Sequence, residues 1–168
     1  MNKLLAWIFS LATATLAGCA SVVPHALREQ ARPVPFAALQ QAPERYAGTL
    51  VLLGGEVLAL RPRGAWLEID VLERPLGLRD RPRVDQPPRG TFTVLLRQEP
   101  GDAETDSLQS GRLVTVVGEV QGRSASSPGP PGPSVVLMAR HLHLWPAPLL
   151  PGGPSIGIEF GYEGSIGF

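Results

Sequence analysis

Five segments rich in apolar residues constrain the fold of this chain most strongly. Where apolar and polar residues alternate with period two, successive side chains point to opposite faces of a β-strand, so one face is offered to a core. The clearest is AWLEIDVL, in which Leu67, Ile69 and Val71 face one way while Glu68 and Asp70 face the other. Loops rich in glycine and proline separate the predicted strands, which are residues 49–60, 65–72, 91–97, 111–122 and 134–145.

Strands of this length with unequal connections predict a mainly β domain. We expect a small five-stranded, partly open, OB-like barrel or a sandwich. The pair Gly54-Gly55 inside the first strand predicts a bulge or a sharp bend. Residues 35–48, ahead of the strands, allow one or two helical turns with Phe36 and Leu39 on one side.

The N-terminus resembles a secretion signal. Lys3 supplies a positive start, Leu4 to Ala12 are almost all apolar, and mostly small residues follow. The only cysteine of the chain, Cys19, ends the tetrad Leu16-Ala17-Gly18-Cys19, which resembles the lipobox of bacterial lipoproteins. That resemblance implies that residues 1–18 are a lipoprotein signal peptide and that Cys19 carries lipid, with acyl chains that hold the protein on a membrane.

Two other interpretations of the N-terminus stay open. Ala12-Thr13-Ala14 has the pattern of an ordinary cleavage site, which would give a soluble secreted protein. Leu4 to Val23 is uncharged and long enough to span a bilayer uncut, although its second half is mainly Ala, Thr, Gly and Ser. Lipoproteins with Asp after the lipidated cysteine usually stay at the inner membrane. Ala20 occupies that position here and indicates the outer membrane.

Composition excludes several classes of function. The chain has 15 basic and 15 acidic side chains, and removal of residues 1–18 takes away only Lys3, which leaves 14 and 15. Nucleic-acid binding needs a clustered positive surplus, so we expect no nucleic-acid partner. A single cysteine excludes an internal disulfide and a cysteine-based zinc site. Mixed polarity and three prolines in residues 20–35 predict that residues 19–35 form a lipidated tether.

Motifs in a fixed order resemble those of the Slp family of outer-membrane lipoproteins, the starvation-inducible type. The entry motif PERYAG precedes them, and the motifs themselves are GGEV (54–57), WLEI (66–69), GRLVTVVG (111–118) and HLHLWP (141–146). The likeness covers the predicted β domain, residues 36–146. Residues 98–110 depart from it, because they replace a Phe-Leu-Asp-Pro-like turn. The resemblance implies an anchored, periplasm-facing domain of the cell outer membrane, linked to stationary phase or stress, and no defined biochemical activity.

The candidates for chemistry are few. His141 and His143 share one strand face with Trp145, and Glu119 joins them only if the fourth strand pairs in the right register. Metal sites need three or four ligands, so the histidines are weak metal candidates and we expect no cofactor. Glu68 and Asp70 are interpreted as exposed acids on the outer face of a strand. We therefore expect a protein that is not an enzyme.

Two further segments stand out. Residues 73–90 contain five arginines, three acids and four prolines, which is typical of a solvated loop but would also suit lipid phosphates near the anchor. The tail, residues 147–168, is rich in proline and glycine, and its residues 155–168 alternate strictly with period two. Such a strand could add to a sheet edge of an outer-membrane protein partner, although a loose tail is the simpler interpretation.

Three hypotheses of function follow. The first is a non-enzymatic outer-membrane lipoprotein that serves as a periplasm-facing binding or envelope-maintenance module. The second is an accessory subunit that docks on an outer-membrane assembly through residues 155–168. The third, the weakest, is a metal-dependent enzyme that uses His141 and His143.

Overall fold

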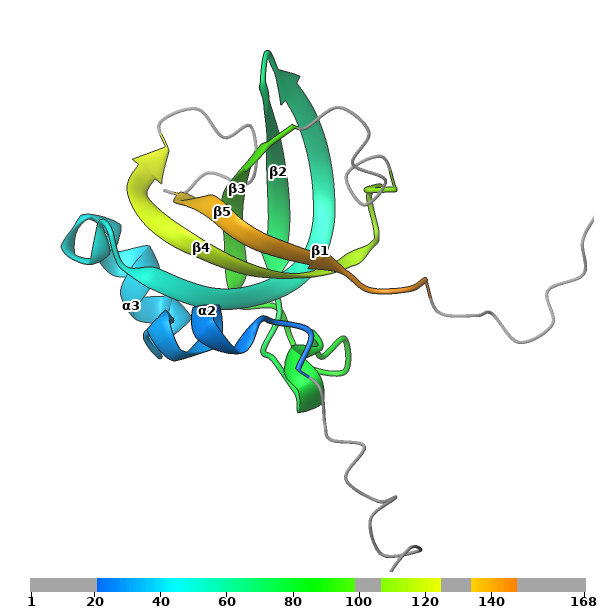
Figure 1. Ribbon diagram of the computed structural model, residues 1–168, viewed down its shortest axis with the longest axis horizontal. Coiled ribbons are helices and arrows are strands. Elements are labelled where there is room, and N and C mark those ends of the chain that lie inside the picture. The colour runs from blue at the N-terminus through cyan, green and yellow to red at the C-terminus, as the bar shows by residue number, and fades with distance from the viewer. Residues whose placement is uncertain (1–20, 99–106, 125–133, 148–168) are drawn as a thin grey trace, which may run out of the picture.

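The computed structural model describes residues 21–98, 107–124 and 134–147. Five strands dominate it, and two short helices and a 3-10 turn precede them (Figure 1). The strands are β1 (Leu50–Arg63), β2 (Trp66–Glu73), β3 (Gly90–Arg97), β4 (Leu113–Ser124) and β5 (Ser134–Leu144). The helical elements are α2 (His25–Gln30), α3 (Phe36–Gln41), η1 (Pro43–Tyr46) and η2 (Leu78–Asp80).

The five strands form a closed barrel in the order β1-β2-β3-β5-β4, in which β4 pairs back onto β1. All neighbours are antiparallel except β3 and β5, which are parallel. The predicted five-stranded, OB-like β domain is confirmed, and the barrel is closed rather than partly open. Closure removes the free sheet edges that an open barrel would leave within the described strands.

Strand β1 bends so that it serves two neighbours. Residues 50–56 pair with β4, and residues 55–63 pair with β2. A Cβ atom on Gly55 would lie 2.1 Å from the carbonyl oxygen of Leu72 in β2, so only glycine fits at this close approach of β1 to β2. The sequence predicted a bulge or a sharp bend at Gly54-Gly55. The register shift falls between Val57 and Ala59, and the glycines lie where β1 passes from β4 to β2.

The barrel interior is a continuous apolar core. Leu67, Ile69 and Val71 belong to it, as the alternation predicts. Phe36 and Leu39 of α3 are buried in the same core, and the ring of Phe36 meets Phe92 edge-on with centroids 6.1 Å apart. Each such side chain contributes about 1.5–3 kcal/mol through burial. Helix α3 therefore confirms the predicted helical turns, and its two apolar side chains extend the barrel core.

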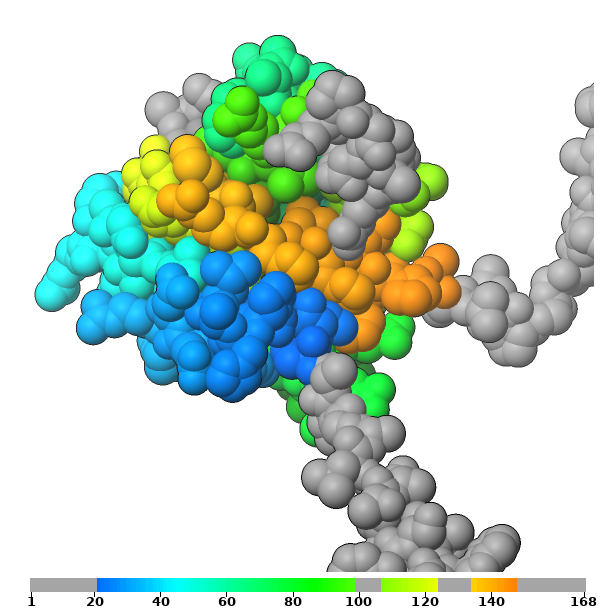
Figure 2. Space-filling view, in the orientation of Figure 1, coloured from blue at the N-terminus to red at the C-terminus, as the bar shows by residue number. Residues whose placement is uncertain are grey.

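The segment before α3 lies against the barrel, although a tether was expected there. The backbone amide of Arg32 donates to the carbonyl oxygen of Leu50 at 2.8 Å, and Val23 is buried. Figure 2 shows these first described residues (blue) covering part of β5 (orange). The tether prediction missed this packing because residues 21–35 have no apolar periodicity; they are held by single polar contacts and one buried valine.

Several predictions fall on residues that the structure does not describe. The signal peptide, residues 1–18, lies outside the described ranges, as do Cys19 and the alternating tail, residues 155–168. Among the described helices, none is both long and apolar enough to cross a membrane.

Candidate functional site

The outer wall formed by β4 and β5 holds the two histidines that the sequence marked as metal candidates. His141 lies opposite Val117 and His143 opposite Thr115 across the antiparallel pair. Leu142, between the histidines, belongs to the barrel core, so both imidazoles are on the outer face. The histidines therefore share a face, as period-two alternation requires.

The two imidazoles have separate partners. Nε2 of His141 donates to the carbonyl oxygen of Val22 at 3.1 Å, and His143 packs edge-on against Trp145 at 4.9 Å between ring centroids. Glu119, considered as a third ligand, pairs with Met138, and its carboxylate accepts a hydrogen bond from Arg140 at 2.7 Å. No group of three or more metal-binding side chains occurs in the part of the chain that the structure describes.

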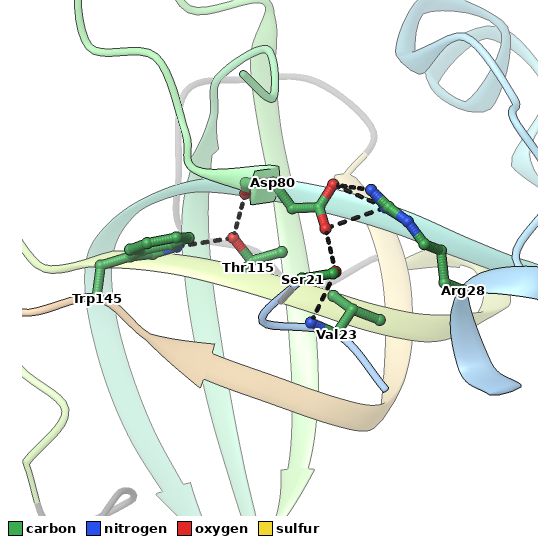
Figure 3. Close-up of polar contacts among 6 residues, drawn as sticks. All are labelled: Ser21, Val23, Arg28, Asp80, Thr115 and Trp145. Atoms are coloured by element: carbon green, nitrogen blue, oxygen red, sulfur yellow. Dashed lines mark hydrogen bonds and ion pairs between the residues drawn. The ribbon is translucent and has the colours of Figure 1, made fainter. Parts of the chain in front are cut away.

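A buried chain of hydrogen bonds crosses this wall (Figure 3). The indole Nε1 of Trp145 donates to Oγ1 of Thr115 at 2.9 Å, and that hydroxyl donates to the carbonyl oxygen of Asp80 at 2.7 Å. The guanidinium of Arg81 lies over the Trp145 ring, 5.2 Å from its centroid, in cation–π geometry. These contacts fasten the loop that follows β2 onto the outer wall.

Asp80 joins that loop to the N-terminal segment. Its side chain is buried, and Oδ2 accepts a hydrogen bond from Oγ of Ser21 at 2.8 Å. Arg28 donates to both carboxylate oxygens and forms an ion pair with Asp80 (Figure 3). Asp80 and Arg79 both have positive φ angles, 64° and 55°. Non-glycine residues accept this conformation only where surrounding contacts enforce it, and here the contacts of Asp80 do so.

The remaining arginines of loop 73–90 are mostly engaged. Arg74 donates to the carbonyl oxygen of Gln86 at 2.7 Å. The hydrogen bond from Arg89 to buried Glu73 raises the pKa of Arg89. The hydrogen bond between Arg83 and Asp85 raises the pKa of the guanidinium and lowers the pKa of the carboxyl. The expected solvated loop is thus tied down at many points.

The outer tip of this loop remains exposed. Leu78 is 93% exposed and Val84 is 61% exposed. A groove of about 530 Å³ lies between them and is also lined by Arg81 and Arg83. Arg79 is exposed as well. The tip therefore combines apolar and cationic side chains.

Glu68 and Asp70 are buried, which corrects the expectation of exposed acids. Arg61 of β1 donates to Asp70 at 2.7 Å and to Glu68 at 3.2 Å. The hydrogen bond to Asp70 raises the pKa of Arg61. Arg61 reaches both acids because β1 pairs with β2 in the register that sets Arg61 opposite Glu68. Arg63 adds a second guanidinium, with Nε 3.3 Å from Oε2 of Glu68, so two arginines balance the two carboxylates in a structural ion-pair network.

The residues that tie the wall together, Asp80, Arg28, Ser21 and Thr115, were not singled out from the sequence. Asp80 lies in a loop without periodicity, and its partner Arg28 is 52 residues away in the expected tether. The one available signal was a short polar residue, Asp80, inside an Arg- and Pro-rich loop, where such residues tolerate positive φ.

Comparison with solved structures finds resemblance at low identity. The small single-stranded DNA-binding protein from Streptomyces coelicolor is 17% identical, with 56% of this chain and 90% of that chain covered and a TM-score of 0.39. A putative aspartyl-tRNA synthetase from Leishmania major Friedlin is 14% identical, with 86% and 26% covered and a TM-score of 0.43. Aspartyl tRNA synthetase from Entamoeba histolytica is 11% identical, with 78% and 25% covered and a TM-score of 0.44. No inference about binding is drawn from likenesses at this level.

No curated protein sequence matches the chain significantly. The model of the outer membrane lipoprotein Slp family matches residues 16–151, which is most of the chain. The match includes all five strands of the barrel, the loop with Asp80 and the tetrad that ends at Cys19. This chain therefore belongs to the Slp family of outer-membrane lipoproteins.

Proposed function

We propose that this outer-membrane lipoprotein is anchored by lipid on Cys19 and presents its barrel to the periplasm as a non-catalytic binding or envelope-maintenance module. The observation that carries the proposal is the packing of the chain directly after the cysteine. Ser21 is bonded to buried Asp80 only two residues beyond Cys19. A lipid at Cys19 would therefore hold the barrel close to the membrane surface.

The candidate catalytic side chains are engaged by other groups of the protein, which supports a role other than catalysis. The carboxylates of Glu68 and Asp70 share the guanidinium of Arg61, and the imidazoles of His141 and His143 contact different groups. General acid–base catalysis needs a titratable group that is free to meet a substrate. Membership of the Slp family favours a link to stationary phase or stress.

Substitution of the cysteine tests the anchor. Cys19→Ala should abolish incorporation of labelled fatty acid and move the protein out of the outer-membrane fraction of a density gradient. Ser21→Ala is the matched control, because it keeps the thiol and should keep both the label and the location. A Cys19→Ala protein that stays in the outer membrane with unchanged electrophoretic mobility would refute the proposal.

The strict alternation of residues 155–168 favours a second candidate, an accessory subunit that adds its terminal strand to a partner of the outer membrane. Crosslinking in cells should then recover a specific outer-membrane protein with the full chain and lose it with a chain ending at Gly153. Identical crosslinks from both chains would remove this candidate.

A further inference from the structure

The tip of the loop between β2 and β3 presents large apolar side chains to solvent beside arginines. Among the described residues, only three large apolar side chains are exposed, and two of them, Leu78 and Val84, lie here. Arg79, Arg81 and Arg83 are exposed between them. Arg83 is neutralised by Asp85 at 2.7 Å and Arg81 lies over the Trp145 ring, whereas no ion pair involves Arg79 within the described chain. The tip is therefore both apolar and positively charged.

The base of the same loop is bonded to the start of the described chain. Asp80 follows Leu78 and Arg79 directly, and its carboxylate holds Ser21 and Arg28 (Figure 3). In Figure 1 the loop around η2 and the first described residues lie at the same end of the barrel. Two residues of chain span at most about 7 Å. A lipid on Cys19 would therefore be joined to the chain within that length of Ser21, which is held at this loop.

We propose that the loop tip is a membrane-contact surface for the phospholipid leaflet that holds the anchor, an inference that rests on lipidation at Cys19. Leu78 and Val84 enter the headgroup region, and the guanidinium group of Arg79 binds lipid phosphate. Guanidinium is opposite in charge to phosphate and can donate two parallel hydrogen bonds to its oxygens. An apolar surface rimmed by cations is the composition that lies stably at a bilayer interface.

The docked N-terminal segment gives this contact a fixed orientation. A lipid on a free tether would let the barrel tumble, and any face could then meet the bilayer. Here the ion pair of Arg28 with Asp80, the hydrogen bond of Ser21 and the contact of Val22 with His141 hold the segment on one side of the barrel. The loop tip, with Leu78 and Val84, lies at the same end of the barrel as this segment (Figure 1).

The single cysteine makes a direct test feasible. Because lipidation consumes the thiol of Cys19, Leu78→Cys provides one free thiol in the full, lipidated protein. An environment-sensitive fluorophore at position 78 is read in vesicles of phosphatidylethanolamine with a minority of phosphatidylglycerol. Leu58→Cys is the matched control, since Leu58 is also an exposed leucine, 41% accessible, but belongs to strand β1 and not to the loop.

Nitroxide-labelled lipids should quench the probe at position 78 several-fold more than the probe at position 58, and its emission should shift to the blue. Arg79→Gln in the Leu78→Cys background should reduce the quenching. Equal quenching at both positions in protein that floats with the vesicles would overturn the proposal while leaving the anchor intact. Protein that carries no lipid and does not float would instead refute the lipidation on which the inference rests. A probe at position 78 that is shielded in cells but not in vesicles would assign the tip to a protein partner and overturn the proposal.

Discussion

The carboxylate of Asp80 accepts hydrogen bonds from the guanidinium of Arg28, whose Nη1 lies 2.9 Å from Oδ1 and 3.0 Å from Oδ2. This pair joins the segment after Cys19 to the loop after β2, across 52 residues of sequence. Charge-assisted hydrogen bonds to both oxygens fix orientation as well as distance. The geometry makes the N-terminal segment part of the folded domain.

Removal of the charge on Asp80 should destabilise the protein. Asp80→Asn keeps the size of the side chain and tolerates positive φ, so the variant removes the ion pair together with one acceptor oxygen. We expect a loss of about 2 kcal/mol, below the value for a fully buried pair because the Arg28 side chain is 40% exposed. Urea denaturation measures it. Asp85→Asn, which breaks an exposed Arg–Asp pair in the same loop, should leave stability unchanged within error. Equal losses of stability in the two variants would contradict a structural role specific to the pair of Arg28 and Asp80.

The hydroxyl of Thr115 should matter more than its methyl group. Thr115→Val leaves the Trp145 indole N–H and the Asp80 carbonyl without their shared partner, at a cost of about 2 kcal/mol. Thr115→Ser keeps the hydroxyl and should cost about 0.8 kcal/mol for one buried carbon. Thermal unfolding and the exchange rate of the Trp145 indole proton measure both effects. A larger loss from Ser than from Val would show that packing dominates at this position.

Gly55→Ala should disrupt the barrel. The added methyl group would meet the backbone oxygen of Leu72, and neither strand can yield without breaking the ladder. We expect a cost of about 3 kcal/mol, seen as loss of cooperative unfolding or of soluble protein. Gly64→Ala is the control: its φ is +62° but no atom lies within 4 Å of the new Cβ, so it should cost about 1 kcal/mol. Equal costs would contradict the close-approach explanation.

Acid should reveal the pair of Arg83 and Asp85. Arg83 donates a hydrogen bond to the carboxylate and holds the pKa of Asp85 below its ordinary 3.8. A carboxyl pKa lowered in the folded state favours the fold above the unfolded pKa, and this effect is lost as pH falls through the folded pKa. Because this pair is exposed, its effect on stability is too small to measure and the pKa itself is the quantity to follow. Arg83→Gln should raise the pKa of Asp85 toward 3.8 in an NMR pH titration. Arg79→Gln should leave the pKa of Asp85 unchanged. A similar rise in both variants would show that the positive charge of the whole loop, and not the hydrogen bond from Arg83, lowers this pKa.

Metal should not bind at the two histidines. His141 contacts the Val22 carbonyl and His143 packs on Trp145, so ligation would require both contacts to break. We expect zinc to bind less than stoichiometrically and to leave Tm unchanged. Calorimetric titration of the full chain measures binding, with the double variant His141→Ala and His143→Ala as control. Stoichiometric zinc that the double variant loses would support the metal-dependent alternative.

The strands could be predicted because the burial pattern of a strand is visible in its own short stretch of sequence. Leu67, Ile69 and Val71 face the core, and their alternation is visible in eight residues of sequence. Closure of the barrel could not be predicted in this way. It depends on the parallel pairing of β3 with β5 and on the pairing of β4 with β1, which join distant segments and leave no local pattern.

The candidate site was harder to predict than the fold for a related reason. Alternation correctly set Glu68 and Asp70 on one face, but it could not show that Arg61 of the neighbouring strand covers them. Asp80 and Arg28 lie in segments without periodicity, where sequence indicates only polarity and proline content. A contact between two such segments depends on the finished barrel that brings them together.

The central claim, that the segment between Cys19, the proposed lipid site, and the barrel is docked, can be tested by amide hydrogen exchange on the full-length protein. The most informative amide is that of Arg32, which donates to the carbonyl of Leu50 in β1. We predict that the amides of Leu27, Arg28 and Arg32 exchange on the order of 100-fold more slowly than in an unfolded chain, and that Asp80→Asn reduces this protection. Exchange of these amides at the unfolded rate, with the strands still protected, would contradict the account and return the segment to a free tether.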